Sequence, residues 1–168
     1  MATSPAEHRA QAPRSIRCAV ITVSDTRTDE TDTSGRALVN LLTAAGHHVA
    51  GRSLLKDDPA AVRARVFEFL ATDVQVIITT GGTGITSRDS TYEVVTALYE
   101  KRLDGFGELF RMLSFQEIGA AAMMSRASAG MAAGRIIISL PGSEDAVRLA
   151  MERLVIPEIG HLVQQAQK

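Results

Sequence analysis

The feature that most constrains the fold is a short apolar segment that ends abruptly in glycine. Residues 74–78 read VQVII, a run of the kind that lies buried on both faces of a parallel sheet. The run is followed by TTGGTGITSRDST at 79–91 and then by 92–98, which has the pattern of a helix. This order of strand, glycine-rich turn and helix favours an α/β fold. The three glycines would let backbone N–H groups approach a charged ligand closely.

The order of strand and helix repeats along the first hundred residues. Apolar runs predict three strands, each followed by a segment with an apolar helical face, at 16–23, 48–55 and 74–79. Short polar residues and one proline are predicted to begin the first two helices: Asp32, Thr33 or Ser34 for the first, and Asp57 or Asp58 before Pro59 for the second. Repeated β-α units predict a parallel sheet with helices on both faces.

The second half of the chain is less regular. GFGELFRMLSFQEIG predicts a helix from about 108 to 118, after paired glycines that either form a loop or leave room for a ligand ring. SRASAGMAAGRIIISL predicts two strands joined by a tight turn at 132–134, with the second strand at 135–140. An apolar face then marks a final helix, and Pro157 is expected to kink it or divide it from a C-terminal one.

The composition excludes several classes of protein. The chain has 168 residues and a net charge of −1, so no overall field attracts nucleic acid or an anionic membrane. No apolar run approaches the roughly 20 residues that span a bilayer. Residues 1–14 lack the apolar region of a secretory signal and are predicted to be a disordered leader to a single cytoplasmic domain at 15–168. Cys18, the only cysteine, is expected to be a buried thiol, and the histidines lack ligand spacing.

Polar or glycine-rich residues follow four of the predicted strands immediately. Parallel strands gather their carboxyl ends at one edge of a sheet, where ligands bind. We therefore expect one pocket to be formed by the following segments: Ser24 and Asp25, 56–58, 81–89, and Pro141, Gly142 and Ser143.

The glycine-rich segment fits neither well-known phosphate-binding pattern. No lysine lies between Gly81 and Thr91, as the Walker form requires, and position 87 is serine where the dinucleotide fingerprint needs glycine. A tight turn explains such glycines about as well as a ligand does. Arg88 and Asp89 suit a phosphate and a magnesium ion, respectively, although Asp89 or Ser90 would also cap the next helix. Asp57 and Asp58 are open to the same two explanations.

Taken together, six short motifs resemble those of one family. They are TVSD at 22–25, DTSG at 32–35, GGTGITSRDST at 81–91, GFGELFR at 105–111, SRA at 125–127 and LPGS at 140–143. In this order, they resemble the molybdenum cofactor biosynthesis B and Mog proteins and the pterin-binding domains of gephyrin-type proteins. The resemblance covers 16 to about 157 and implies a three-layer α/β/α sandwich with a mostly parallel central sheet, assembled as a trimer or hexamer.

The resemblance also implies an activity. Its Mog branch uses Mg-ATP to adenylylate the terminal phosphate of molybdopterin and releases pyrophosphate. Other enzymes of the cofactor pathway would then be partners. Some members of the B branch are expected to bind the pterin without adenylylating it, so a non-catalytic carrier is the alternative. A helper that binds other phosphorylated ligands on the same fold is a third possibility.

The family motifs imply roles for particular residues. Asp57 and Asp89 would hold Mg²⁺ against the ATP phosphates, while Arg88 and the N–H groups of the glycine-rich segment would stabilise negative charge. Ser125 and Arg126, in the SRA motif, would contact the pterin or a neighbouring subunit. The remaining residues assigned to substrate or phosphate binding are Ser24, Asp25, Gly81, Gly82, Thr83, Gly84, Pro141, Gly142 and Ser143.

Overall fold

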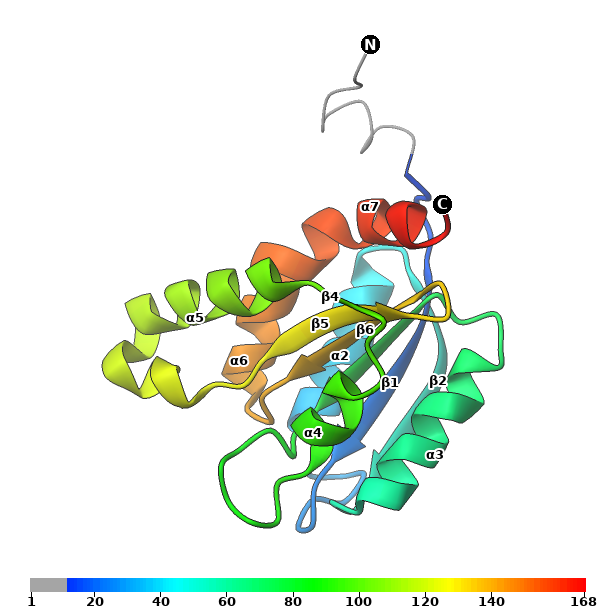
Figure 1. The fold of residues 1–168 in the computed structure, drawn as a ribbon. Coiled ribbons are helices and arrows are strands. Elements are labelled where there is room, and N and C mark those ends of the chain that lie inside the picture. The colour runs from blue at the N-terminus through cyan, green and yellow to red at the C-terminus, as the bar shows by residue number, and fades with distance from the viewer. Residues whose placement is uncertain (1–11) are drawn as a thin grey trace.

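Six strands form a single sheet in the order β2-β1-β3-β6-β5-β4 (Figure 1). The computed structural model describes residues 12–168, so most of the predicted leader, 1–11, lies outside the described residues. The strands are β1 (Arg17–Val23), β2 (His48–Leu55), β3 (Val76–Thr80), β4 (Lys101–Arg102), β5 (Ser128–Ala132) and β6 (Arg135–Leu140). The neighbours β2, β1, β3 and β6 run parallel, whereas β5 pairs antiparallel with both β6 and β4. The sheet is therefore mixed.

The parallel part of the sheet contains a switch point in its topology. From β1 the chain crosses to β2 on one side, and it later returns to β3 on the other side of β1. The loops that follow β1 and β3 therefore lead away to opposite faces and leave a crevice between them. This crevice lies at the carboxyl ends of the strands, where the sequence predicts a pocket.

Helices cover both faces of the sheet, as the sequence predicts. They are α2 (Thr33–Ala44), α3 (Pro59–Leu70), α4 (Thr91–Thr96), α5 (Asp104–Ile118), α6 (Glu144–Ala150) and α7 (Ile156–Ala166). Alternate residues of the central strands point to opposite faces. Val20 and Ile78 pack with α2, α5, α6 and α7 in one core, while Ile21 and Ile77 pack with α3 and α4 in the other. The result is three layers (Figure 1).

Two aspartates determine where the first helices begin. The carboxylate of Asp32 accepts a hydrogen bond from the Gly35 N–H at 2.9 Å and so caps α2. The carboxylate of Asp58 accepts from Ala60 and Ala61 at the start of α3, where Pro59 needs no N–H partner. Asp58, and not Asp57, therefore caps α3, which leaves the side chain of Asp57 free for other contacts.

The antiparallel end departs from the sequence prediction in three places, the first of which is β4, a two-residue strand that was not predicted. Helix α5 begins at Asp104 and not near 108, so the paired glycines lie inside its first turn, where Phe106 and Phe110 pack against the core. A 3₁₀ helix, η1 (Gly119–Met124), follows it. The predicted division at Pro157 is confirmed, since Pro157 lies in the first turn of α7, and a π-helical turn, Met151–Val155, joins α6 to it. Within residues 12–168, no helix has both the length and the apolar character needed to cross a bilayer.

Candidate functional site

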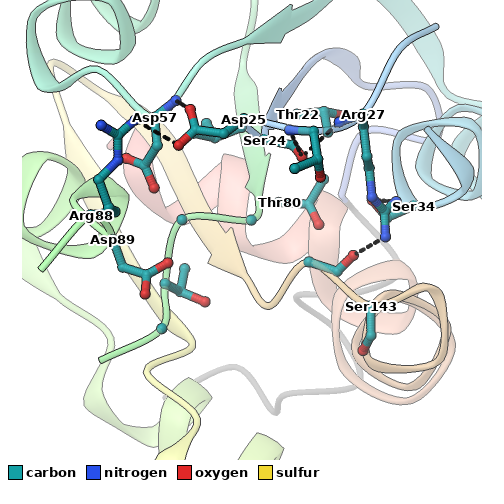
Figure 2. Close-up of a pocket in the computed structure, with 17 residues that line it drawn as sticks. Thr22, Ser24, Asp25, Arg27, Ser34, Asp57, Thr80, Arg88, Asp89 and Ser143 are labelled. Atoms are coloured by element: carbon teal, nitrogen blue, oxygen red, sulfur yellow. Dashed lines mark hydrogen bonds and ion pairs between the residues drawn. The ribbon is translucent and has the colours of Figure 1, made fainter. Parts of the chain in front are cut away.

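A cavity of about 510 Å³ opens at the carboxyl ends of the parallel strands (Figure 2). All four strand-end loops that the sequence singles out contribute to it. Its walls are Thr22, Val23, Ser24, Asp25, Thr26, Arg27, Ser34, Asp57, Thr80, Gly81, Gly82, Thr83, Gly84, Arg88, Asp89, Gly142 and Ser143. Most of these side chains are polar, which suits a phosphorylated ligand better than an apolar one.

Two glycines determine the path of the loop that follows β3. Gly81 and Gly82 have φ values of 93° and 63°, in the left-handed region that other residues seldom adopt. A Cβ at Gly81 would lie 2.1 Å from the Val23 carbonyl oxygen, and one at Gly82 would lie 2.1 Å from Thr91 Oγ1. The glycines therefore bring the backbone close to β1 and to the start of α4. Larger residues would push the loop into the cavity or away from it.

Asp57 faces this loop from the end of β2. Its Oδ1 accepts hydrogen bonds from the N–H and the hydroxyl of Ser90, at 3.2 and 2.6 Å. Its Oδ2 lies toward Gly82, where a Cβ would come within 2.8 Å of it. Ser90 therefore orients the carboxylate and leaves Oδ2 available at the cavity wall.

Asp89 is held by its own loop. Its Oδ2 accepts from the N–H and the hydroxyl of Thr86, at 3.0 and 2.6 Å. The Thr86 hydroxyl bond, together with N–H donors from Thr86 and Gly84, lowers the pKa of this carboxyl despite some desolvation. Asp89 is therefore ionised at neutral pH. Figure 2 shows its carboxylate and that of Asp57 on the same side of the cavity.

An ion pair closes the side of the cavity beyond Asp57. Arg88 donates to Asp25 Oδ2 at 2.7 Å, and Asp25 Oδ1 accepts from the Asp57 N–H at 3.1 Å. This hydrogen bond from Arg88 lowers the pKa of Asp25 and raises the pKa of Arg88 itself. The side chain of Arg88 remains 72% exposed, so it can exchange Asp25 for a ligand oxygen at little cost.

A second arginine, which sequence reasoning missed, lies on the opposite side of the cavity. Arg27 donates to the Ser34 hydroxyl and to the Gly142 carbonyl oxygen, each at 3.0 Å (Figure 2). It thereby connects the loop after β1 to the turn before α6, where the hydroxyl of Ser143 accepts from the Ala146 N–H. The only available signal was its position four residues after a predicted strand. The two arginines give the cavity a cationic group on each side.

Three of the residues assigned to substrate binding do not line the cavity. The Pro141 carbonyl oxygen accepts from the Thr80 hydroxyl at 2.9 Å, which holds the turn in place. Ser125 and Arg126 lie beyond the glycine-rich loop, and Arg126 donates to the carbonyl oxygen of Thr83 at 2.8 Å. The remaining predicted residues come together at the cavity, from four different loops.

The oxygen atoms on one side of the cavity fit a hard divalent cation. Asp57 Oδ2 makes no hydrogen bond with another described residue and lies at the cavity wall with Asp89. Two carboxylates together with substrate phosphates and waters are the ligands that Mg²⁺ usually takes. Among residues 12–168, no three acidic, cysteine or histidine side chains form a metal site by themselves. An ion here would therefore depend on ligands from a substrate.

Comparisons with known proteins agree with this architecture. Residues 19–161 match a family model described as a probable molybdopterin binding domain. The chain is 50% identical over 161 residues to the molybdenum cofactor biosynthesis protein B of Bacillus cereus, covering 95% of both chains.

Solved structures of proteins from cofactor biosynthesis are also similar to this chain. A crystal structure of a molybdenum cofactor biosynthesis protein B has a TM-score of 0.89 at 49% identity, covering 93% of this chain and 98% of that one. A tungsten cofactor synthesizing protein, MoaB from Pyrococcus furiosus, has a TM-score of 0.85 at 37% identity, covering 94% and 100% of the two chains.

Proposed function

We propose a function from one premise: this chain belongs to the family of molybdopterin-binding domains of molybdenum cofactor biosynthesis proteins. In this proposal, the chain binds molybdopterin and transfers the adenylyl group of ATP to its terminal phosphate. A phosphate oxygen of the pterin attacks the α-phosphorus of ATP, the bond from that phosphorus to the bridging oxygen breaks, and pyrophosphate leaves. No proton has to be abstracted from the attacking phosphate.

One observation carries the proposal. Asp57, Asp89, Arg88 and the glycine-rich loop line the same cavity, although they come from different strand ends. A transfer between phosphates requires mainly positioning and charge neutralisation, with little covalent work by the protein. N–H groups of the loop and the guanidinium of Arg88 would stabilise the charge that develops on the phosphate oxygens. Ser143 and Arg27, on the other side, would bind a second anionic group.

The two carboxylates would hold a magnesium ion. Asp57 and Asp89 are each fixed by hydrogen bonds from one neighbouring hydroxyl residue, so neither needs to reorganise before binding. When bound, the ion would neutralise part of the charge on the ATP phosphates. Asp58 has no such role in this proposal, because its carboxylate caps α3.

A pyrophosphate assay tests the proposal. Purified protein mixed with molybdopterin and Mg-ATP is expected to release pyrophosphate in proportion to the pterin added. Asp89→Ala should lower the turnover steeply and leave the pterin dissociation constant within about threefold, since the carboxylate acts on the nucleotide side. Equal losses of turnover and pterin affinity would contradict the assigned role.

A non-catalytic pterin carrier is the second candidate function. It is compatible with the names of the more similar relatives, which are cofactor biosynthesis proteins B and specify no reaction. A carrier would retain molybdopterin through gel filtration and release no pyrophosphate in the same assay. Retention of a nucleotide without the pterin would instead indicate a helper for other phosphorylated ligands.

Self-assembly is part of the proposal. Leu109, Met112, Phe115 and Ile118 on α5 are 48–61% exposed, and Met123 and Met124 on η1, which follows α5 directly, are 77% and 56% exposed. We call these six residues the α5–η1 apolar surface. Exposed large apolar side chains gathered in this way commonly mark a protein interface. We expect further copies of this chain to cover it, in a trimer or a hexamer.

A further inference from the structure

Arg126 contacts the glycine-rich loop but does not itself line the cavity. It lies in the segment between η1 and β5, and its side chain is 24% exposed. Its Nε donates to the Thr83 carbonyl oxygen at 2.8 Å, and its Nη2 donates to the carbonyl oxygen of Gly84. One guanidinium therefore binds two successive peptide carbonyls of the loop that bears Asp89.

These contacts determine which way the loop amides face. In a planar trans peptide, the N–H points opposite to the carbonyl oxygen. With the carbonyl oxygens of Thr83 and Gly84 turned toward Arg126, the N–H groups of Gly84 and Ile85 are directed to the other side of the loop. Asp89 lies on that side, because the Gly84 N–H is one of the donors to its carboxylate. Without the hydrogen bonds from Arg126 to the two carbonyl oxygens, either peptide unit could rotate and turn its N–H in another direction.

Arg126 is itself held by the first turn of the helix that ends the loop. Its Nη1 contacts the carboxylate of Glu93, and its Cζ lies 4.7 Å from the centroid of the Tyr92 ring. Both residues belong to α4, so Arg126 ties the beginning of the loop to the element that follows its end. A hydrogen bond from the Thr91 N–H to the Gly82 carbonyl oxygen, at 2.9 Å, also joins the beginning of the loop to the start of α4.

We propose that Arg126 is a positioning residue, which orients the amides of the glycine-rich loop and the carboxylate of Asp89 and does not touch the substrate. This inference rests on the proposed function, because it assigns the loop a task in binding phosphates. It also replaces the sequence-based expectation that Arg126 contacts the pterin. All four of its partners (Thr83, Gly84, Tyr92 and Glu93) are groups of the protein, and Arg126 is absent from the cavity wall.

Hydrogen–deuterium exchange in the ligand-free protein tests this directly. The N–H groups of Thr86, Ser90 and Thr91 are hydrogen-bonded, so peptides covering 82–91 should exchange slowly in the wild type. Arg126→Gln should speed that exchange roughly tenfold or more, since the loop can then open locally without breaking two hydrogen bonds from Arg126 to its carbonyl oxygens. Arg126→Lys, which can bind one carbonyl at a time, should give an intermediate rate. Arg65→Gln, which removes an exposed ion pair on α3, is the control and should change nothing.

Two further measurements separate positioning from ligand contact. Arg126→Gln should lower kcat for pyrophosphate release at least about tenfold and leave the pterin dissociation constant within about twofold. Glu93→Gln should have a smaller effect, and combining it with Arg126→Gln should add nothing, because Glu93 acts through Arg126.

Unchanged exchange of 82–91 in Arg126→Gln, with β6 still protected, would overturn the inference, whether or not pterin affinity falls. Exchange needs neither ATP nor pterin. A wild-type protein that releases no pyrophosphate would thus refute the proposed function, while the exchange rates would still decide the role of Arg126.

Discussion

The two ends of the sheet differ in what they leave exposed to solvent. At the parallel end, the loops after β1, β2, β3 and β6 surround one polar cavity and bond extensively with one another. At the antiparallel end, α5 and η1 expose the α5–η1 apolar surface, and none of its residues lines that cavity. Loops at the carboxyl ends of parallel strands converge by topology, whereas an antiparallel edge does not gather them.

Because of this difference, we expect that substitutions can alter catalysis and self-assembly separately in this molecule. Substitutions in the strand-end loops should change turnover or local stability and leave the state of association unchanged. Substitutions on α5 should do the reverse. The following experiments test that separation.

The largest effect is expected from two neighbouring aspartates that have different tasks. Asp57→Asn should lower kcat on the order of 10²–10³-fold, comparable to the loss of one preorganised electrostatic group in an active site. Asp58→Ala is the matched variant, and it should cost only about 1 kcal/mol of unfolding free energy through the lost cap of α3. Steady-state kinetics and urea unfolding measure the two quantities. A similar loss of kcat in both variants would contradict the different roles assigned to Asp57 and Asp58.

The buried carboxylate of Asp32 stabilises the parallel end of the sheet. Asp32 is fully buried, and its Oδ2 accepts from Arg52 at 2.7 Å and from Thr22, which lines the cavity, at 2.8 Å. Asp32→Ala should lower the unfolding free energy by about 3 kcal/mol, because it uncaps α2 and leaves Arg52 with only its longer contact, 3.7 Å, to the exposed Asp29. Asp73→Ala, which breaks an exposed ion pair, should cost less than about 1 kcal/mol.

The contribution of Asp32 should depend on pH in a defined direction. Desolvation raises its pKa, but hydrogen bonds from Arg52, Gly35 and Thr22 outweigh this and lower it below the ordinary value. A carboxyl with a lowered pKa stabilises the fold above the unfolded-state pKa of roughly 3.9 and loses that contribution as the pH falls through the folded-state value. The difference between wild type and Asp32→Ala in urea unfolding should therefore shrink below about pH 4. A difference that grows there would contradict this assignment.

A substitution at the antiparallel end should change the state of association of the protein. Phe115 is 61% exposed, so Phe115→Glu should dissociate the assembly into smaller species, as measured by light scattering, and leave the midpoint of thermal unfolding of the isolated chain nearly unchanged. Gln165→Glu adds the same charge on α7, away from the α5–η1 apolar surface, and should have no effect. An unchanged mass for Phe115→Glu would show that another surface mediates the assembly.

The smallest expected effect concerns the lone thiol. Burial raises the pKa of Cys18 to about 12, so the thiol remains protonated at pH 8 and is shielded in the core. The native protein should therefore show almost no reaction with a disulfide reagent at pH 8, and urea should restore the reaction. Rapid labelling of the native protein would show that Cys18 is not a core residue.

Much of the parallel end could be predicted from the sequence because its signals are local. The bounds of β2 match the predicted 48–55, and Asp32, which caps α2, is one of the three residues predicted to begin that helix. The convergence of the strand-end loops followed from the general rule for parallel sheets.

The remaining features depend on partners that are distant in sequence. Arg27 bonds to a carbonyl 115 residues away, and Arg126 bonds to one 43 residues before it, so neither contact leaves a local pattern. Strand β4 has only two residues and no periodicity to detect. Helix α5 begins in a turn with two glycines, whose low helix propensity is offset by the packing of Phe106 and Phe110.

The central claim, that the cavity transfers an adenylyl group to molybdopterin, is tested most directly by following the α-phosphate of ATP. ATP labelled at that position is incubated with magnesium, molybdopterin and the protein, and the products are separated. The account predicts that the label appears in a pterin product in equal amount to the pyrophosphate released, and that Asp57→Asn slows the formation of both to the same extent. Label that remains in ATP, or that appears only in free AMP, would contradict it.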